Sequence, residues 1–189
     1  MAKINENLFI LGASGMVGRQ MVYRNCNGKI ILSKRPRRTQ KQTDAQLAQM
    51  LRFKEATIYA KAALTDEATR KAYSEKAQNS ADKLSAYNVA VADYLNAPVI
   101  KKVNLENYSG QAGEKIVVSA FDDFEMKEVT IEIRQSDNTL VEKGKALADS
   151  NGLDWVYTTQ SANAMLAGSV VTACAVDRPG NVTKEEVIV

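Results

Sequence analysis

The sequence predicts an α+β protein of several domains, in which a β-hairpin region, a helical middle and an antiparallel β domain follow one another. Near the start, two strand-like stretches flank Asn27-Gly28, a pair typical of a hairpin turn. Residues 39–64 contain good helix formers and neither Gly nor Pro. Beyond Pro98, short segments that alternate apolar and polar residues recur regularly. These observations divide the chain into residues 1–38, 39–98 and 99–189.

Composition excludes several classes of protein. Of 189 residues, 45% are hydrophobic and 25% are charged, as in soluble globular proteins. We expect neither a secretory segment nor a membrane span, because no apolar run approaches about 18 residues. Cys26 and Cys174 are far apart in the sequence, which predicts no disulfide framework. The chain has no His, which excludes Ser–His and Cys–His catalysis, so we expect a protein that is not an enzyme and needs no cofactor.

Charge is distributed unevenly along the chain. Residues 1–100 carry 16 Lys and Arg against 8 Asp and Glu, whereas residues 101–189 carry 9 against 14. Such asymmetry indicates two regions with different surroundings. A chain that is basic in one half and acidic in the other can also pack head to tail with copies of itself.

The glycine motif "GASGMVG" near the N-terminus has two interpretations. Its spacing of Gly12, Gly15 and Gly18 resembles the phosphate loop of NAD(P)-dependent extended reductases and semialdehyde dehydrogenases. A dinucleotide fold, however, needs further strand–helix–strand units, and about sixty residues of polar helix follow instead. The strand-like "QMVYR" and "KIILSK" around Asn27-Gly28 favour a β-hairpin. An NADP-dependent oxidoreductase remains the alternative.

Three helices are predicted in the middle region. Thr39 or Thr43 is expected to cap the first and Thr65 the second, and Asn79-Ser80 is the expected break before the third. The helices are rich in Ala and poor in large apolar residues, so we expect them to pack against partners or against the β regions. A stripe on the first helix is predicted to be buried, and it comprises Leu47, Met50, Leu51, Ile58 and Leu64, with Phe53 and Ala56 nearby.

The last ninety residues predict an antiparallel β-sandwich. Six or seven short strand-like segments are separated by turn sequences such as "SDNT", "SNG" and "RPGN". Val129, Ile131 and Ile133 alternate with polar residues and share one face. This strand count and rhythm are typical of immunoglobulin-like or fibronectin-like sandwiches, and Trp155 is expected to be the central core aromatic residue.

A wider resemblance covers most of the chain. The segments "GASGMVGRQMVYRNCNGKIILSKRPRRT", "RFKEATIYAKAAL" and "LSAYNVAVADYLNAP" resemble a group of uncharacterised proteins from Bacteroidetes and their phages. That group has a similar glycine-containing start, a helical middle and an immunoglobulin-like end, and some of its members are virion structural components. The resemblance implies a capsid auxiliary, head-fibre or tail accessory role. It implies no binding residues.

Two sets of side chains are candidates for interaction. The basic run that includes Lys34, Arg35, Arg37 and Arg38 contains no acid and can bind nucleic acid or an acidic protein surface; the alternative is a solvated linker. The second set consists of tyrosines on the predicted helices, which form either an interface or ordinary helix–helix packing. They are Tyr59, Tyr87 and Tyr94, with Tyr73.

Four oxygen-bearing residues lie at the expected loop ends of the sandwich. If the loops meet at one pole, Asp122, Asp123, Asp177 and Asn181 can hold calcium. The alternative, which the sequence favours, is that they are ordinary turn formers, because their spacing matches no EF-hand loop.

Together these features favour a non-enzymatic structural or interaction protein of a larger assembly, with a bacteriophage virion as the leading case. The expected partners are copies of the chain, other virion or scaffold proteins and, through the basic run, nucleic acid, but no membrane. The expected location is a virion assembled in the host cytoplasm, or the cytoplasm if the protein is not viral. Besides the oxidoreductase, a surface- or carbohydrate-binding module that uses the sandwich loops is an alternative.

Overall fold

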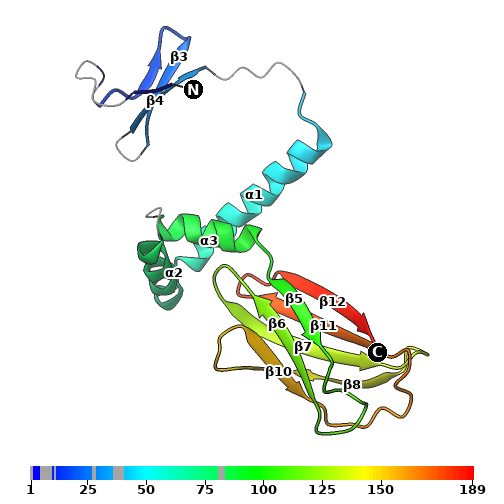
Figure 1. Ribbon diagram of the computed structural model, residues 1–189. Coiled ribbons are helices and arrows are strands. Elements are labelled where there is room, and N and C mark those ends of the chain that lie inside the picture. The colour runs from blue at the N-terminus through cyan, green and yellow to red at the C-terminus, as the bar shows by residue number, and fades with distance from the viewer. Residues whose placement is uncertain (1, 5–9, 11, 27–28, 36–40, 81–83) are drawn as a thin grey trace. The chain divides into compact units, whose positions relative to one another are not determined.

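The computed structural model describes residues 2–4, 10, 12–26, 29–35, 41–80 and 84–189. The chain forms two compact units, Met1–Leu47 and Ala48–Val189. Its described residues form three helices and three antiparallel sheets, so the α+β class is confirmed (Figure 1). None of the described helices is long and apolar enough to cross a membrane.

The first unit contains a four-stranded antiparallel sheet with strand order β1-β4-β3-β2. The predicted hairpin is its centre, because Met21 pairs with Lys34 and Cys26 pairs with Lys29. Residues 16–25 lie in two strands and the bend between them, and not in the helix that a phosphate loop would precede. The strands are β1 (Ala2–Ile4), β2 (Gly15–Val17), β3 (Met21–Cys26) and β4 (Lys29–Lys34).

Gly12 and Gly18 of the motif lie in turns on either side of β2, and Gly15 is its first residue. Gly12, Gly15 and Gly18 all have positive φ, at 79°, 107° and 58°. An L side chain rarely adopts such angles, so Gly is the residue that permits these turns. The geometry accounts for the glycines without a bound pyrophosphate.

Three helices follow, namely α1 (Asp44–Ala63), α2 (Glu67–Asn79) and α3 (Ala86–Leu95). Thr43 caps α1 as predicted: its hydroxyl accepts from the Gln46 N–H at 3.3 Å, and the Gln46 side chain accepts from the Thr43 N–H at 3.1 Å. The cap of α2 is Asp66 and not Thr65, because the Asp66 carboxylate accepts from the Thr69 N–H at 2.9 Å. The predicted break after Asn79 is confirmed.

The prediction of a buried apolar stripe is confirmed for Ala56 and in part for Leu64, which packs against the helical core just after α1, but it is wrong for the large residues within the helix. Ala56 and Ala60 form the face of α1 that is fully buried, against α2 and α3. Their small side chains fit a closely packed helix interface, whereas the large residues lie elsewhere around the helix. The exposed fractions are 48% for Leu47, 50% for Met50, 58% for Leu51, 52% for Phe53 and 59% for Ile58.

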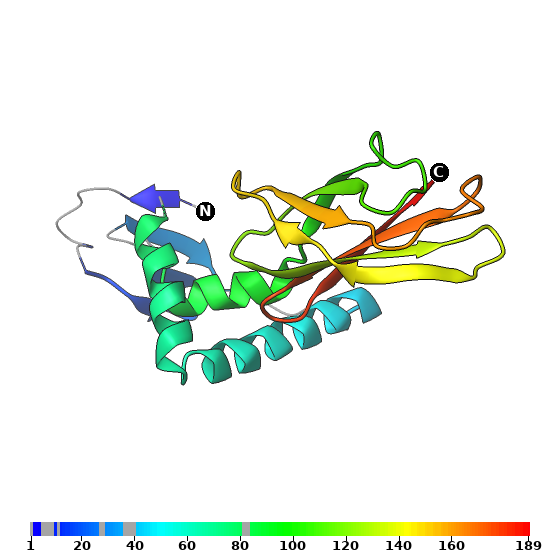
Figure 2. The ribbon, with the colours of Figure 1, turned by 90° about the horizontal axis from the view of Figure 1, so that it is seen from below.

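The C-terminal part is a β-sandwich of two four-stranded sheets, ordered β5-β6-β10-β9 and β12-β11-β7-β8. Figures 1 and 2 show the two sheets as two layers, and side chains from both form one apolar core. The strands are β5 (Val99–Asn104), β6 (Lys115–Phe121), β7 (Met126–Arg134), β8 (Leu140–Lys145), β9 (Leu147–Ala148), β10 (Asp154–Thr158), β11 (Val170–Asp177) and β12 (Val182–Ile188).

The centre of the sandwich core matches the predicted alternation but not the predicted aromatic residue. Val129, Ile131 and Ile133 of β7 are fully buried on one face, as expected. Trp155 is only partly buried and packs at the margin of the core, because β10 pairs there with the two-residue strand β9. Tyr157, two residues further along the same face, is the aromatic side chain of β10 that is buried, with 4% exposed.

Candidate functional site

Three carboxylates meet where the helices join the sandwich, and we call this cluster the acidic junction. It consists of Asp93 from α3, Asp122 from the loop between β6 and β7, and Asp177 at the end of β11. Each contributes one carboxylate oxygen, and the three oxygens lie within 4.8 Å of one another. Like charges at this separation repel strongly away from water. The cluster therefore requires a compensating positive charge or a proton.

Asp93 is the most constrained member of the acidic junction. Its side chain is 2% exposed. The Tyr73 hydroxyl donates to its Oδ2 at 2.5 Å, and the Tyr59 and Tyr73 hydroxyls are 3.0 Å apart. Its Oδ1 is buried and has no hydrogen-bond partner. Burial raises the pKa of Asp93 to about 6, and the charges of Asp122 and Asp177 act in the same direction.

Main-chain donors hold the other two carboxylates in place. Asp122 Oδ2 accepts from the N–H groups of Phe124 at 3.0 Å and Glu125 at 3.1 Å. Asp177 Oδ1 accepts from the N–H groups of Gly180 at 2.8 Å and Asn181 at 2.6 Å. These short-range bonds fix the direction of each side chain before any ligand is considered.

Asn181 connects the end of α3 to the loop between β11 and β12. Its amide Nδ2 lies 3.4, 3.1 and 3.3 Å from the carbonyl oxygens of Asp93, Tyr94 and Asn96, and 2.7 Å from Asp177 Oδ2. These carbonyls belong to the C-terminal end of a helix, which carries a partial negative charge. The acidic junction therefore lies in a negative environment even apart from its carboxylates.

Arg178 is a basic residue whose charge acts on Asp93, but its hydrogen bonds go to residues outside the acidic junction. Its Nε and Nη2 donate to Glu125 at 2.9 and 2.6 Å, and its Nη1 donates to the Thr69 hydroxyl at 3.1 Å. The guanidinium carbon also lies 5.6 Å from the centre of the Phe124 ring. Its charge lowers the pKa of Asp93, but less than burial raises it.

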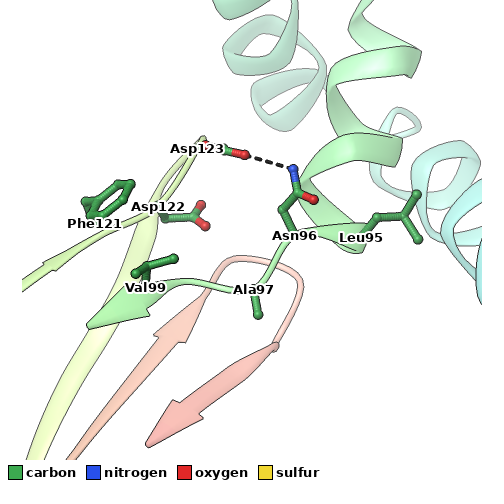
Figure 3. Close-up of a pocket in the computed structure, with 7 residues that line it drawn as sticks. All are labelled: Leu95, Asn96, Ala97, Val99, Phe121, Asp122 and Asp123. Carbon is green, nitrogen blue, oxygen red and sulfur yellow. Dashed lines mark hydrogen bonds between the residues drawn. The ribbon is translucent and has the colours of Figure 1, made fainter. Parts of the chain in front are cut away.

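The structure brings together only part of the calcium set that the sequence indicated. Asp122 and Asp177 meet, but Asp123 accepts a hydrogen bond from Asn96 Nδ2 at 2.8 Å instead (Figure 3). In Figure 3 the Asp122 carboxylate points toward the connection between α3 and β5, on the side away from Phe121. Sequence reasoning missed Asp93. The sequence feature that pointed to Asp93 is that it is the single charged residue of the helix "AYNVAVADYL".

A second feature is the exposed apolar side of α1, which we call the outer α1 surface. It comprises Met50, Leu51 and Ile58, each at least half exposed. Exposed apolar groups that adjoin on one helix are typical of interaction surfaces. These residues were predicted to be core, and their exposure contradicts that prediction.

The predicted interaction residues fall into three groups. Lys34 and Arg35 are exposed at the end of β4, and the Arg35 N–H donates to the Gln20 carbonyl at 2.9 Å. Arg37 and Arg38 lie outside the described residues. Their role with nucleic acid stays a prediction.

The tyrosines contribute to the helical core. The rings of Tyr59 and Tyr94 are 5.3 Å apart between centroids, and Tyr87 and Tyr94 pack against the buried cluster. All three are half-buried. Packing thus accounts for their position, and a part in binding other molecules stays a prediction.

Comparisons with known proteins give no family. No protein-family model and no curated protein matches the chain. An engineered protein of known structure is 20% identical, with a TM-score of 0.36 over 48% of this chain and 18% of that one. CopC from Methylosinus trichosporium OB3b is 12% identical, with a TM-score of 0.35 over 47% and 87% of the two chains. A tetra-tandem repeat in the extending region of a large adhesion protein is 18% identical, with a TM-score of 0.33 over 48% and 22%. These scores carry no functional argument, and the chain spans less than a fifth of the first structure.

Proposed function

We propose that this chain is a non-enzymatic structural or interaction protein of a larger assembly, and that its sandwich is immunoglobulin-like. A bacteriophage virion is the assembly that the sequence resemblance implies, with the chain as a capsid auxiliary, head-fibre or tail accessory protein. The observation that carries the proposal is the outer α1 surface. We further propose that the basic run, of which Lys34 and Arg35 are exposed, binds nucleic acid in the same assembly.

The outer α1 surface supports the proposal because α1 has apolar side chains on two sides. Ala56 and Ala60 face α2 and α3, while Leu51 and Ile58 lie on the other side of the helix and are more than half exposed. Removing such side chains from water contributes roughly 25 cal/mol for each Å² of apolar area, and the cost of association is subtracted from that sum.

A second copy of the chain is the partner that the charge distribution favours. Residues 1–100 are basic, with 16 Lys and Arg against 8 acids, and residues 101–189 are acidic, with 14 acids against 9 bases. Lys54 and Lys61 are exposed on α1 beside the apolar side chains. We therefore infer that the outer α1 surface of one copy binds the acidic sandwich of the next, which is a head-to-tail contact.

Sedimentation velocity over a range of concentrations and salt tests this proposal. The expected result is self-association that weakens at high salt and is lost in a Leu51→Gln, Ile58→Gln double variant. Leu84→Gln is the matched control, because Leu84 is also exposed but lies outside α1. A monomer at every concentration, or equal loss in the control, contradicts the proposal. Mass spectrometry of purified phage particles tests the virion assignment, which predicts the chain as a stoichiometric component.

A further inference from the structure

We propose that the acidic junction binds one calcium ion, which joins α3 to the loops of the sandwich. The ligands are the carboxylates of Asp93, Asp122 and Asp177. This site is independent of the self-association proposed above, because it uses other residues and a different ligand.

The distances between the three carboxylate oxygens suit a calcium ion. Calcium binds oxygen ligands at about 2.3–2.6 Å, so two ligands on opposite sides of the ion lie roughly 5 Å apart. The three carboxylate oxygens, all within 4.8 Å of one another, satisfy this limit. They come from three separate elements, so the fold, and not local sequence, brings them together.

Asp93 has a buried carboxylate oxygen that lacks a hydrogen-bond partner. A buried carboxylate oxygen without a partner is costly, because it has lost its water and gained nothing in exchange. Asp93 Oδ1 is such an oxygen, whereas Oδ2 accepts from Tyr73. A bound cation supplies the missing partner for Oδ1 and offsets the repulsion from the other two carboxylates.

The choice of calcium follows from the ligand chemistry. Three carboxylates, with carbonyl groups nearby at the end of α3, are hard oxygen donors of the kind that calcium prefers. Thiol and imidazole ligands, which suit zinc, do not contribute to this cluster. Magnesium requires a near-ideal octahedron with shorter bonds, which side chains held by Phe124, Glu125 and Gly180 adopt less readily.

Calcium binding at this place has a mechanical consequence. Asp93 lies on α3, whereas Asp122 and Asp177 lie in two loops of the sandwich. An ion bound by all three carboxylates links α3 to both sandwich loops, in addition to the hydrogen bonds that Asn181 makes. We therefore expect the calcium-bound protein to resist heat and proteolysis between α3 and β5 better than the calcium-free protein.

Isothermal titration of chelator-treated protein with CaCl₂ tests the proposal. We expect one ion per chain, and a dissociation constant at least about tenfold higher in Asp122→Asn, whose side chain can still accept from the same two N–H groups. Asp123→Asn is the matched control, because it removes the same charge from the adjacent residue, outside the cluster. Its affinity is expected to change less than about twofold.

A second measurement does not depend on the variants. Terbium, a calcium substitute, is expected to luminesce when Tyr73 is excited, because the Tyr73 hydroxyl bonds directly to the ligand Asp93, and added calcium is expected to quench this signal.

The proposal is overturned if wild-type protein binds no calcium at millimolar concentration, if Asp123→Asn loses as much affinity as Asp122→Asn, or if magnesium binds as tightly as calcium.

Discussion

Replacing Tyr73 with Phe removes the hydroxyl that supports the acidic junction. Tyr73 is fully buried, and its hydroxyl is the donor to Asp93 Oδ2 at 2.5 Å. Since Asp93 Oδ1 already has no partner, the variant leaves a buried carboxylate with neither oxygen bonded to a donor side chain. A hydrogen bond to a charged group contributes about 1.5–3 kcal/mol, so we expect Tyr73→Phe to lower the free energy of unfolding by about that amount in calcium-free protein at pH 7.

Tyr59→Phe is the matched control for this substitution. It also removes one hydroxyl, which lies 3.0 Å from that of Tyr73 but belongs to a half-buried residue and contacts no carboxylate. The expected loss is about 0.5–1.5 kcal/mol, as for a bond between neutral groups. In an Asp93→Asn background, where the acceptor is neutral, the cost of Tyr73→Phe is expected to fall to the same range.

Urea denaturation followed by circular dichroism at 222 nm measures these differences, because α1, α2 and α3 dominate that signal. The variants are compared with chelator present so that bound ions do not contribute. If Tyr73→Phe costs no more than Tyr59→Phe, or if its cost is unchanged by Asp93→Asn, then Asp93 is not a buried charged acceptor and the description of the acidic junction is wrong.

Three further predictions concern pH, the sandwich core and nucleotide binding. In calcium-free protein, the pKa of Asp93 is raised to about 6 from an ordinary 3.8, so the folded state keeps the Asp93 proton to higher pH than the unfolded state does. The contribution of Asp93 to stability is therefore fully present below about pH 4 and falls by roughly 3 kcal/mol as the pH rises through 6. Urea titrations at several pH values measure this change, and the Asp93→Asn variant is expected to lack it. Gly144→Ala places a Cβ 2.6 Å from Cε2 of the buried Tyr157 ring, so we expect a loss of about 1–3 kcal/mol in the unfolding transition followed by Trp155 fluorescence, and an unchanged midpoint would contradict the packing of β8 on β10. NADPH is expected to leave the melting temperature unchanged, because the glycine motif forms bends of an antiparallel sheet; a shift abolished by Gly15→Asp would restore the oxidoreductase hypothesis.

Much of the fold was predictable because local patterns agree with the tertiary structure. The alternation of Val129, Ile131 and Ile133 matches the pleat of a half-buried strand, and Asn27-Gly28 correctly indicated the pairing of the flanking strands. The helix breaks at Asn79-Ser80 and before Pro98 were also visible in the sequence. Each of these features, the strand alternation, the hairpin turn and the helix ends, depends mainly on residues that are close together in the sequence.

The failures occurred where contacts distant in sequence decide. The large apolar residues of α1 have the spacing of a core stripe, but the helices pack through Ala56 and Ala60, so Leu51 and Ile58 remain exposed. Periodicity identifies the apolar positions of a helix and does not reveal which of two apolar sides faces the rest of the chain. Trp155 was assigned to the core because immunoglobulin-like sandwiches bury a central Trp, whereas its position beside the short edge strand β9 leaves it partly exposed.

The acidic junction illustrates the same limit. Asp122 and Asp177 could be identified as loop residues that meet if the loops share one pole, but Asp93 is separated from Asp177 by most of the sandwich sequence. Its neighbours on α3 are apolar, so only the packed structure shows that its carboxylate is buried and incompletely bonded. An isolated acid on a buried helix face is the sequence signal that would have identified it.

Photocrosslinking between isotopically distinct copies tests most directly whether the outer α1 surface binds a second copy of the chain. A benzophenone side chain is placed at Ile58, or at Lys71 on α2 as the exposed control, and unlabelled protein is mixed with ¹⁵N-labelled protein. We expect mixed-isotope crosslinks from position 58 to peptides within residues 99–189, and few from position 71. Crosslinks confined to single copies, or equal yields from both positions, would contradict it.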